Sequence, residues 1–181
     1  MYITYLNTVV LRYSLCALIL IVILCLQISV CHSEVFRGDV VRIADGDTIT
    51  VLLENDRKMR VRLLGIDTPE LDQSFGIEAR EYLAQMSLGK TVTCVCKKQD
   101  RYKRWVCQVL IDGVDVNLML VRDGLAWWYR YYKYEQLLED QVRYEQAELM
   151  AKRQQIGLWS DKTSVPPWEW RRQRREQQKM K

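Results

Sequence analysis

The feature that most constrains the fold is a series of short β-branched segments separated by turn-forming residues. The second and third segments alternate apolar with charged side chains, which is typical of half-buried antiparallel strands. The turn Asp45-Gly46-Asp47 links the first two segments. We therefore expect five strands, at residues 35–43, 48–53, 59–66, 91–97 and 105–111.

Three further segments favour helices. Residues 74–84 switch to helical spacing, and Gly89 follows as a stop. A short helix is expected from its cap Asp115 to Gly124, and a longer one over about residues 135–155. Five strands with helices inserted and appended predict an α+β fold, an OB-like five-stranded β-barrel with about three helices.

An apolar leader precedes the predicted barrel. Arg12 is the only charged side chain among residues 1–33, and Cys31 and Ser33 are small residues that favour signal-peptide cleavage before Glu34. The alternative is an uncleaved membrane anchor, because the apolar run approaches the roughly 20 residues that a spanning helix needs. Residues 34–160 would then form a secreted or periplasmic domain, or one anchored facing outside the cytoplasm.

The histidine content limits the kinds of active site and metal site that the chain can form. The chain has a single histidine, His32, at the end of the leader. The domain that follows therefore lacks imidazole acid–base pairs, Ser-His-Asp nucleophiles and His-ligated zinc. Any acid, base or metal ligand in it must be a carboxylate, a carbonyl or another oxygen.

Two acidic clusters lie at the ends of predicted strands. The first, at residues 45–48, suits a hairpin turn, and the second, at residues 67–70, suits a strand end stopped by proline. Arg62 and Arg104 lie on predicted strands, where basic side chains usually form a solvated face. However, Arg62 lies only five residues before Asp67. One strand could therefore place an arginine and, at its end, a carboxylate at the same open end of the barrel.

These residues form part of a longer series of motifs. In order along the chain the motifs are Ile43-Ala-Asp-Gly-Asp-Thr-Ile, Val61-Arg-Leu-Leu-Gly-Ile-Asp-Thr-Pro-Glu, Gly76-Ile-Glu-Ala-Arg, Asp100-Arg-Tyr-Lys-Arg104, Leu120-Val-Arg-Asp-Gly-Leu-Ala and Ile156-Gly-Leu-Trp. With this order and spacing, the chain resembles the staphylococcal-type nuclease (thermonuclease, SNase-like) family over roughly residues 35–159.

The resemblance implies a calcium site. Asp47 and Asp67 would bind calcium (Ca²⁺) through their carboxylates and Thr68 through its backbone carbonyl, with Asp45 as a close neighbour. Calcium takes 6–8 oxygen ligands. Water and substrate phosphate would therefore have to complete the shell, and the site without substrate should bind calcium weakly.

The resemblance also implies catalytic roles for three side chains. Arg62 and Arg104 would hold the scissile phosphate, and Glu70 would act on the attacking water. Two guanidiniums suit this task, because they are always protonated and donate bidentate hydrogen bonds to the charge that develops on the phosphate. Glu70 could be a general base or could only orient the water.

The chain departs from the family pattern at two places. Lys103 stands where the best-known member has a glycine between its tyrosine and arginine, and an aromatic run occupies residues 127–132. This run leaves the base-stacking residue open, with Tyr131 or Tyr132 favoured. Tyr102 is a further candidate for substrate binding.

We therefore expect an exported, calcium-dependent endonuclease that hydrolyses DNA and RNA with little sequence or sugar specificity, acting as a monomer without another cofactor. One alternative is a non-catalytic OB-fold module that binds single strands by stacking and charge. A pure binder has no use for paired acids beside a phosphate site, which argues against that alternative. A membrane-tethered surface protein is the third interpretation, if the leader persists.

Three cysteines follow the leader: Cys94, Cys96 and Cys107. An odd number in an exported chain leaves at least one free thiol or an intermolecular bond. Cys94 and Cys96 cannot easily bridge each other at i, i+2, whereas Cys107 on the next strand could lie opposite either of them. Either a cross-strand disulfide forms, or all three are small core residues.

The excess of basic residues lies in the C-terminal tail, residues 161–181. The segment 165–170 carries two prolines and two tryptophans and suggests an anchor. The charged arm that follows lacks hydrophobic periodicity. It is either a solvated, frayed terminus or an arm that engages phosphates beyond the cleavage site. Its basic residues are Arg171, Arg172, Arg174, Arg175, Lys179 and Lys181.

Overall fold

The computed structural model describes residues 33–180 of the chain. The expected signal peptide or anchor at residues 1–33 lies almost entirely outside the described residues. None of the helices between residues 33 and 180 is long and apolar enough to cross a bilayer.

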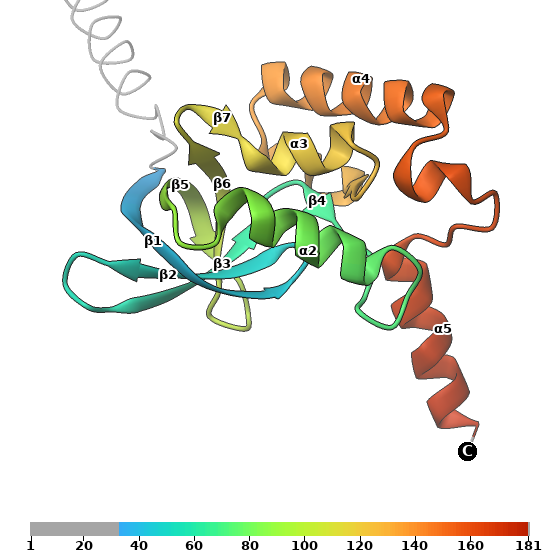
Figure 1. Ribbon diagram of the computed structural model, residues 1–181. Coiled ribbons are helices and arrows are strands. Elements are labelled where there is room, and N and C mark those ends of the chain that lie inside the picture. Colours follow the sequence, from blue (N-terminus) through green and yellow to red (C-terminus); the bar gives the residue numbers. More distant parts are fainter. Residues whose placement is uncertain (1–32, 181) are drawn as a thin grey trace, which may run out of the picture. The chain divides into compact units, whose positions relative to one another are not determined.

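Five strands form a closed barrel (Figure 1). β1 pairs antiparallel with both β2 and β5, while β2 pairs with β3 and β5 with β6 in the same sense. The parallel pairing of β3 with β6 closes the barrel. This order confirms the predicted OB-like α+β fold. The strands are β1 (Glu34–Asp45), β2 (Thr48–Leu53), β3 (Lys58–Leu63), β5 (Thr91–Gln99) and β6 (Trp105–Ile111).

The interior of the barrel is filled by alternate apolar side chains of these strands, because successive residues of a strand point to opposite faces. Register shifts interrupt β1 between Val40 and Arg42 and again between Ile43 and Asp45. Such bulges bend a strand and increase its twist, which a small barrel requires. The fully buried core residues include Val40, Ile49, Val51, Val61, Leu63, Val92 and Val109.

Three helices cover the barrel: α2 (Gly76–Ser87), α3 (Val116–Arg122) and α4 (Leu138–Gln154). The side chain of Asp115 accepts a hydrogen bond from the backbone N–H of Leu118 (3.1 Å), which confirms it as the cap of α3. Asp115 also accepts from the hydroxyl of Tyr144 on α4 (2.9 Å). One buried carboxylate therefore ties two helices together.

One predicted strand is divided in the structure. The segment expected as one strand at residues 59–66 ends at Leu63, because Gly65 adopts a left-handed conformation (φ 76°) that breaks the strand. The short strand β4 (Ile66–Asp67) follows and pairs with β8 (Trp127–Trp128). The helix expected over about residues 135–155 forms as α4, and a separate 3-10 turn, η1 (Arg130–Glu135), precedes it.

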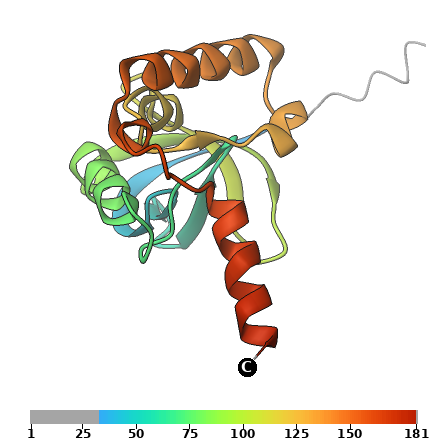
Figure 2. The ribbon, with the colours of Figure 1, turned by 90° about the vertical axis from the view of Figure 1, so that its right-hand side faces the viewer.

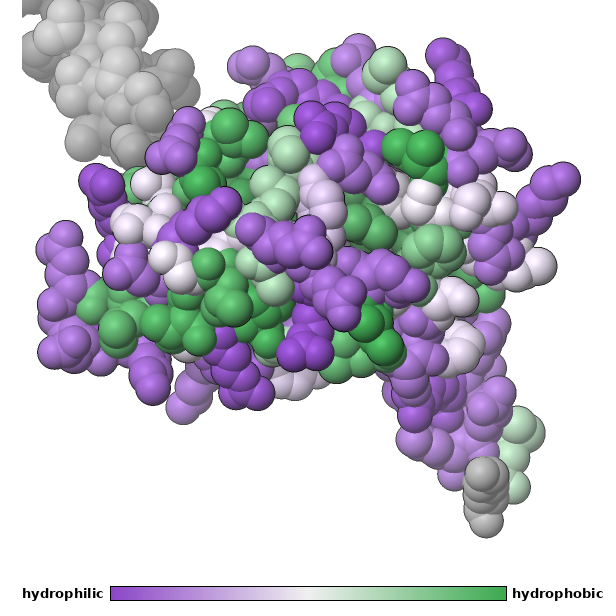
Figure 3. All heavy atoms as spheres, in the orientation of Figure 1, coloured by the Kyte–Doolittle hydropathy of each residue, from purple (hydrophilic) through white to green (hydrophobic). Residues whose placement is uncertain are grey.

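The frayed-terminus interpretation of the tail is wrong for most of its length, because a helix, α5 (Pro167–Lys179), forms there (Figure 2). Pro167 occupies the first turn, where its missing N–H costs nothing. Trp168 stacks on Tyr129 with ring centroids 5.1 Å apart and docks the start of the helix. Beyond this contact the surface of α5 is mostly hydrophilic (Figure 3). The sequence of this helix therefore shows little hydrophobic periodicity.

The structure shows which of the two interpretations of the cysteines is correct. Cys96 and Cys107 face each other in the β5–β6 pairing and form a disulfide, and Cys94 is a buried free thiol. Burial raises the pKa of the Cys94 thiol to about 12. The cross-strand disulfide is the alternative that the structure supports.

Candidate active site

A cleft with a volume of about 640 Å³ opens beside the ends of β1, β3, β5 and β6. It gathers side chains that are far apart in the sequence. Tyr132, one of the two predicted base-stacking residues, and Tyr102, the further candidate for substrate binding, line it, but Tyr131 is 72% exposed and does not. The predicted metal and catalytic residues in its wall are Asp45, Asp47, Arg62, Asp67, Thr68, Glu70 and Arg104.

The turn between β1 and β2 fixes Asp47. Gly46 approaches Thr68 so closely that an added Cβ would lie 2.7 Å from the threonine Oγ1, so a larger residue would push the turn away. Asp47 Oδ2 accepts hydrogen bonds from the backbone N–H (3.0 Å) and the hydroxyl (3.1 Å) of Thr68. These bonds hold the Asp47 carboxylate, which is 6% exposed, against the loop that follows β4.

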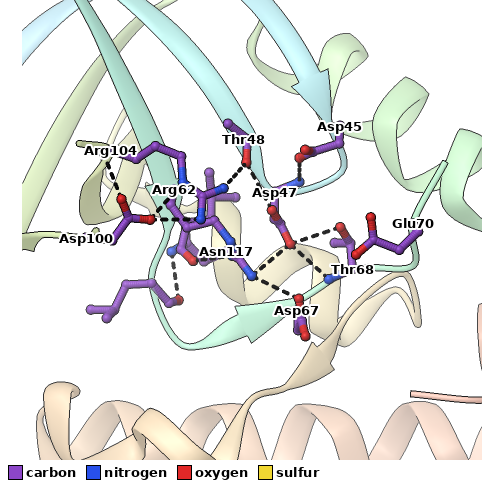
Figure 4. Close-up of polar contacts among 12 residues, drawn as sticks. Asp45, Asp47, Thr48, Arg62, Asp67, Thr68, Glu70, Asp100, Arg104 and Asn117 are labelled. Atoms are coloured by element: carbon purple, nitrogen blue, oxygen red, sulfur yellow. Dashed lines mark hydrogen bonds and ion pairs between the residues drawn. The ribbon is translucent and has the colours of Figure 1, made fainter. Parts of the chain in front are cut away.

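Arg62 lies between the two predicted metal-binding carboxylates (Figure 4). Its Nη2 is 3.0 Å from Asp47 Oδ2 and 3.0 Å from Asp67 Oδ1, while its Nη1 donates to the carbonyl of Leu63 (2.7 Å). Asp67 is only 1% exposed. A buried carboxylate needs such a partner, because an uncompensated charge in the interior is costly.

The loop after β4 carries Glu70. Gly76, at the start of α2, packs against this loop so closely that an added Cβ would lie 1.9 Å from the carbonyl oxygen of Glu70. The backbone N–H of Glu70 donates to the side chain of Gln73 (3.2 Å). The carboxylate of Glu70 is more accessible than the two aspartates, with 39% of its side chain exposed, and is open to a water molecule in the cleft.

Arg104 reaches the cleft from the start of β6. Asp100 accepts from its Nε (2.8 Å), and Arg104 Nη1 donates to the hydroxyl of Thr48 (3.2 Å). These contacts extend the guanidinium toward Asp47 (Figure 4). The ring of Tyr102 lies beside it, 5.4 Å from the guanidinium carbon.

The electrostatics of the acidic residues reflect their burial. Burial, together with the charge of Asp47, raises the pKa of Asp45 to about 6. Burial also raises the pKa of Asp67, although Arg62 and Arg171 oppose the shift. Closely spaced buried carboxylates resist ionising together unless a cation lies among them. The site therefore favours cations.

The donor set fits a hard divalent cation. Two buried carboxylates, Asp47 and Asp67, lie so close that one guanidinium nitrogen contacts both, and their oxygens are the ligand type that calcium takes. Among residues 33–180, no group of three or more His, Cys, Asp and Glu side chains is arranged as a metal site. Any metal here would thus depend on carbonyl, water and substrate oxygens beyond the two carboxylates.

Sequence reasoning did not assign four residues of this region to the site. Arg171 and Arg175 come from α5 and line the cleft, as does Tyr129. Burial lowers the pKa of Arg171, but the hydrogen bonds and charges of Asp67 and Glu70 outweigh it and raise that pKa above its usual value. Asn117 is fully buried beneath the site and donates to the carbonyls of Leu64 and Cys107 (3.1 Å each).

Comparison with known proteins adds an independent observation. Residues 60–161 match the family described as staphylococcal nuclease homologue. The chain is 43% identical to a micrococcal nuclease of Shigella flexneri, over 76% of this chain and 81% of that protein. It is 36% identical to an uncharacterized endonuclease of Haemophilus influenzae, over 81% and 79%. It is also 34% identical to the staphylococcal-like nuclease CAN1 of Arabidopsis thaliana, over 66% and 35%.

Proposed function

Because the chain belongs to the staphylococcal nuclease family and is a nuclease, we propose that it is an exported, calcium-dependent endonuclease of DNA and RNA. One observation carries the proposal. Two arginines, two buried aspartates and one accessible glutamate line a single cleft of about 640 Å³. This combination can hold a phosphate and direct a water molecule at it.

The two arginines act on the charge of the phosphodiester. Attack on phosphorus increases the negative charge on the phosphate oxygens, and cations must meet it. Arg104 projects into the cleft from β6, and its guanidinium keeps donors beyond those that Asp100 occupies. Arg62 enters from β3 and is held by the Leu63 carbonyl, so its orientation is set before substrate arrives.

Glu70 acts on the water. Its carboxylate is more accessible than those of Asp47 and Asp67, which are almost fully buried. With no histidine after residue 32, Glu70 accepts the proton of the attacking water or orients that water. Both roles require the carboxylate to be held within hydrogen-bond reach of the water.

Calcium would be held by Asp47, Asp67 and the carbonyl of Thr68. When bound, it would add positive charge beside the phosphate and help to fix the substrate. The proposal that the metal is calcium rests on the oxygen-only donor set and on the extracellular supply of this ion. Asp47 and Asp67 bring two negative charges, which the neighbouring Arg62 partly neutralises, so weak binding without substrate is expected.

Low specificity follows from the kind of contacts that the cleft offers. Tyr102, Tyr129 and Tyr132 provide aromatic faces along its wall. Stacking tolerates every base, because each base has a π-face. Phosphate contacts likewise carry no sequence information. We therefore propose that the enzyme accepts both DNA and RNA.

Export is supported by the apolar leader and by the disulfide between Cys96 and Cys107, since disulfides persist mainly in oxidising compartments. If the leader is cleaved before Glu34, mass spectrometry of the exported protein will give a chain that begins at that residue. Recovery of the whole chain in the membrane fraction would instead indicate an anchored protein.

The proposed activity can be tested on purified protein with circular DNA and with RNA, each in calcium and in excess chelator. We expect nicking and degradation of both polymers in calcium, loss of cleavage in chelator and recovery when calcium is restored. Retention of intact DNA on the protein, without cleavage in any metal, would instead support the single-strand-binding module.

A further inference from the structure

The C-terminal helix supplies a guanidinium to the catalytic cleft. Arg171 lies in the second turn of α5. Its Nη2 donates to Asp67 Oδ2 (2.6 Å), and its Nη1 donates to Asp67 Oδ1 (3.2 Å) and to Glu70 Oε1 (2.8 Å). One planar group thus joins the buried aspartate to the accessible glutamate, across more than 100 residues of chain.

The position of Arg171 does not depend on these carboxylates alone. Trp168 stacks on Tyr129 before it, and the side chain of Gln73 donates to the carbonyl of Val165. Arg174, after it, forms an ion pair with Asp72. Because α5 is held on both sides of Arg171, packing directs the guanidinium into the cleft.

The orientation of the Glu70 carboxylate depends on Arg171 more than that of the Asp67 carboxylate does. Among the described residues, Arg171 is the only hydrogen-bond partner of the Glu70 carboxylate. Asp67, by contrast, also contacts Arg62. A glutamate side chain gains considerable rotamer freedom when it is released. Without Arg171, the Glu70 carboxylate would therefore sample many orientations in the cleft.

We propose that Arg171 is a positioning residue of the nuclease, which holds Glu70 and Asp67 in the arrangement that hydrolysis needs. This inference rests on the proposed function. Arginine suits the role better than lysine, because its planar fork contacts two carboxylates at once while an ammonium acts as a compact point charge. The C-terminal helix is then part of the active centre and not an appendage of it.

The test compares Arg171→Gln and Arg171→Lys with the control Arg172→Gln, in the full chain. Arg172 lies on the same helix and pairs with Glu169 (2.5 Å), outside the cleft. Small misplacements of catalytic groups cost up to about 100-fold in rate. We expect Arg171→Gln to lower kcat roughly 10- to 100-fold with little change in KM, Arg171→Lys to recover part of the loss, and the control to keep the wild-type kcat.

Thermal unfolding and circular dichroism will show whether each variant is folded and retains α5. Calcium binding in the absence of substrate, measured by calorimetry, gives a second readout. A rise in KM alone would make Arg171 a substrate ligand and overturn the positioning role. Unchanged or faster turnover, with tighter calcium binding, would mean that Arg171 only occupies the place of a metal ion.

These outcomes remain separate from the proposed function. If the wild-type protein does not cleave nucleic acid in calcium, the proposed function fails. If the wild-type protein cleaves and folded Arg171→Gln cleaves equally well, only the inference about Arg171 fails.

Discussion

At the scale of single residues, Arg62 and Arg104 differ in the carboxylates that they neutralise. Arg62 compensates two buried carboxylates, whereas Arg104 is paired with Asp100 near the surface. Removing one partner of a buried ion pair typically costs about 3–5 kcal/mol of stability. In the proposed mechanism, Arg62 therefore contributes to both stability and catalysis, and Arg104 mainly to catalysis.

We predict that Arg62→Gln and Arg104→Gln each lower kcat by about 100-fold or more, because each removes a cation that meets the developing charge. Only Arg62→Gln should also lower the midpoint of urea unfolding substantially. Steady-state kinetics at a temperature where both variants are folded, together with urea titrations, will separate the two effects. Near-normal turnover by Arg104→Gln would remove that residue from the phosphate site.

The two aspartates permit a prediction about the metal. Asp47→Asn and Asp67→Asn should raise the calcium concentration needed for half-maximal activity before they abolish turnover, because each removes a charged ligand from a sparse shell. A nucleotide analogue should tighten calcium binding in calorimetry, since its phosphate would complete the shell. If the analogue leaves calcium affinity unchanged, the two ligands do not share a site.

At the scale of elements, the strands could be read from the sequence because their β-branched residues alternate with polar ones. β2 and β6 have the predicted bounds, and Asp115 caps α3 as expected. The break at Gly65 was not predicted, because a single left-handed residue leaves the apolar pattern around it intact. α5 was missed because its docking depends on Trp168, whose partner Tyr129 is distant in sequence.

The pairing of β5 with β6 predicts the thiol content of the chain from residue 34 onward. Unfolded, unreduced protein should show one free thiol, from Cys94, and reduction should reveal three. In the native state at pH 8, Cys94 should not react with thiol reagents, since burial raises its pKa to about 12 and keeps it protonated. Three thiols without reductant would contradict the disulfide.

Reduction of the same disulfide should also destabilise the barrel. Closing a loop of this size contributes roughly 3 kcal/mol through the entropy of the unfolded chain. The difference between oxidised and reduced protein in urea unfolding measures it.

At the scale of the whole molecule, truncation of the tail would not test the basic arm alone. Removing residues 171–181 would take away Arg171 together with the rest of the basic arm. Arg175 lines the cleft one turn further along α5, and Lys179 lies one more turn along the same side, at i+4 and i+8 from Arg171. These two residues test the role of the arm in binding without disturbing the contacts of Arg171.

We predict that the double variant Arg175→Gln/Lys179→Gln flattens the salt dependence of DNA binding, by about 0.7–0.9 in log–log slope for each phosphate that it no longer neutralises. Cleavage of a dinucleotide-like substrate should hardly change, because it cannot reach both residues. Arg57→Gln/Lys58→Gln removes the same charge from exposed residues outside the cleft and serves as control. Equal slopes for both double variants would leave α5 without a role in polymer binding.

The candidate site was predictable to the extent that its residues form local motifs. Asp47, Arg62, Asp67, Glu70 and Arg104 lie in short strings of recognisable spacing, and all of them line one cleft. The contribution of α5 was not predictable, because no local pattern links an arginine in a basic tail to carboxylates more than 100 residues earlier. Such a contact is set by packing of the whole domain.

The most direct test of the central claim, that this cleft hydrolyses phosphodiesters, is the single-turnover cleavage of a labelled oligonucleotide by wild-type protein and by Glu70→Gln. Both proteins are used in calcium at concentrations that saturate the oligonucleotide. We predict unchanged oligonucleotide affinity and a cleavage rate lowered by at least about 100-fold, because the variant cannot take up the proton of the attacking water. Equal cleavage rates for the two proteins would contradict the account.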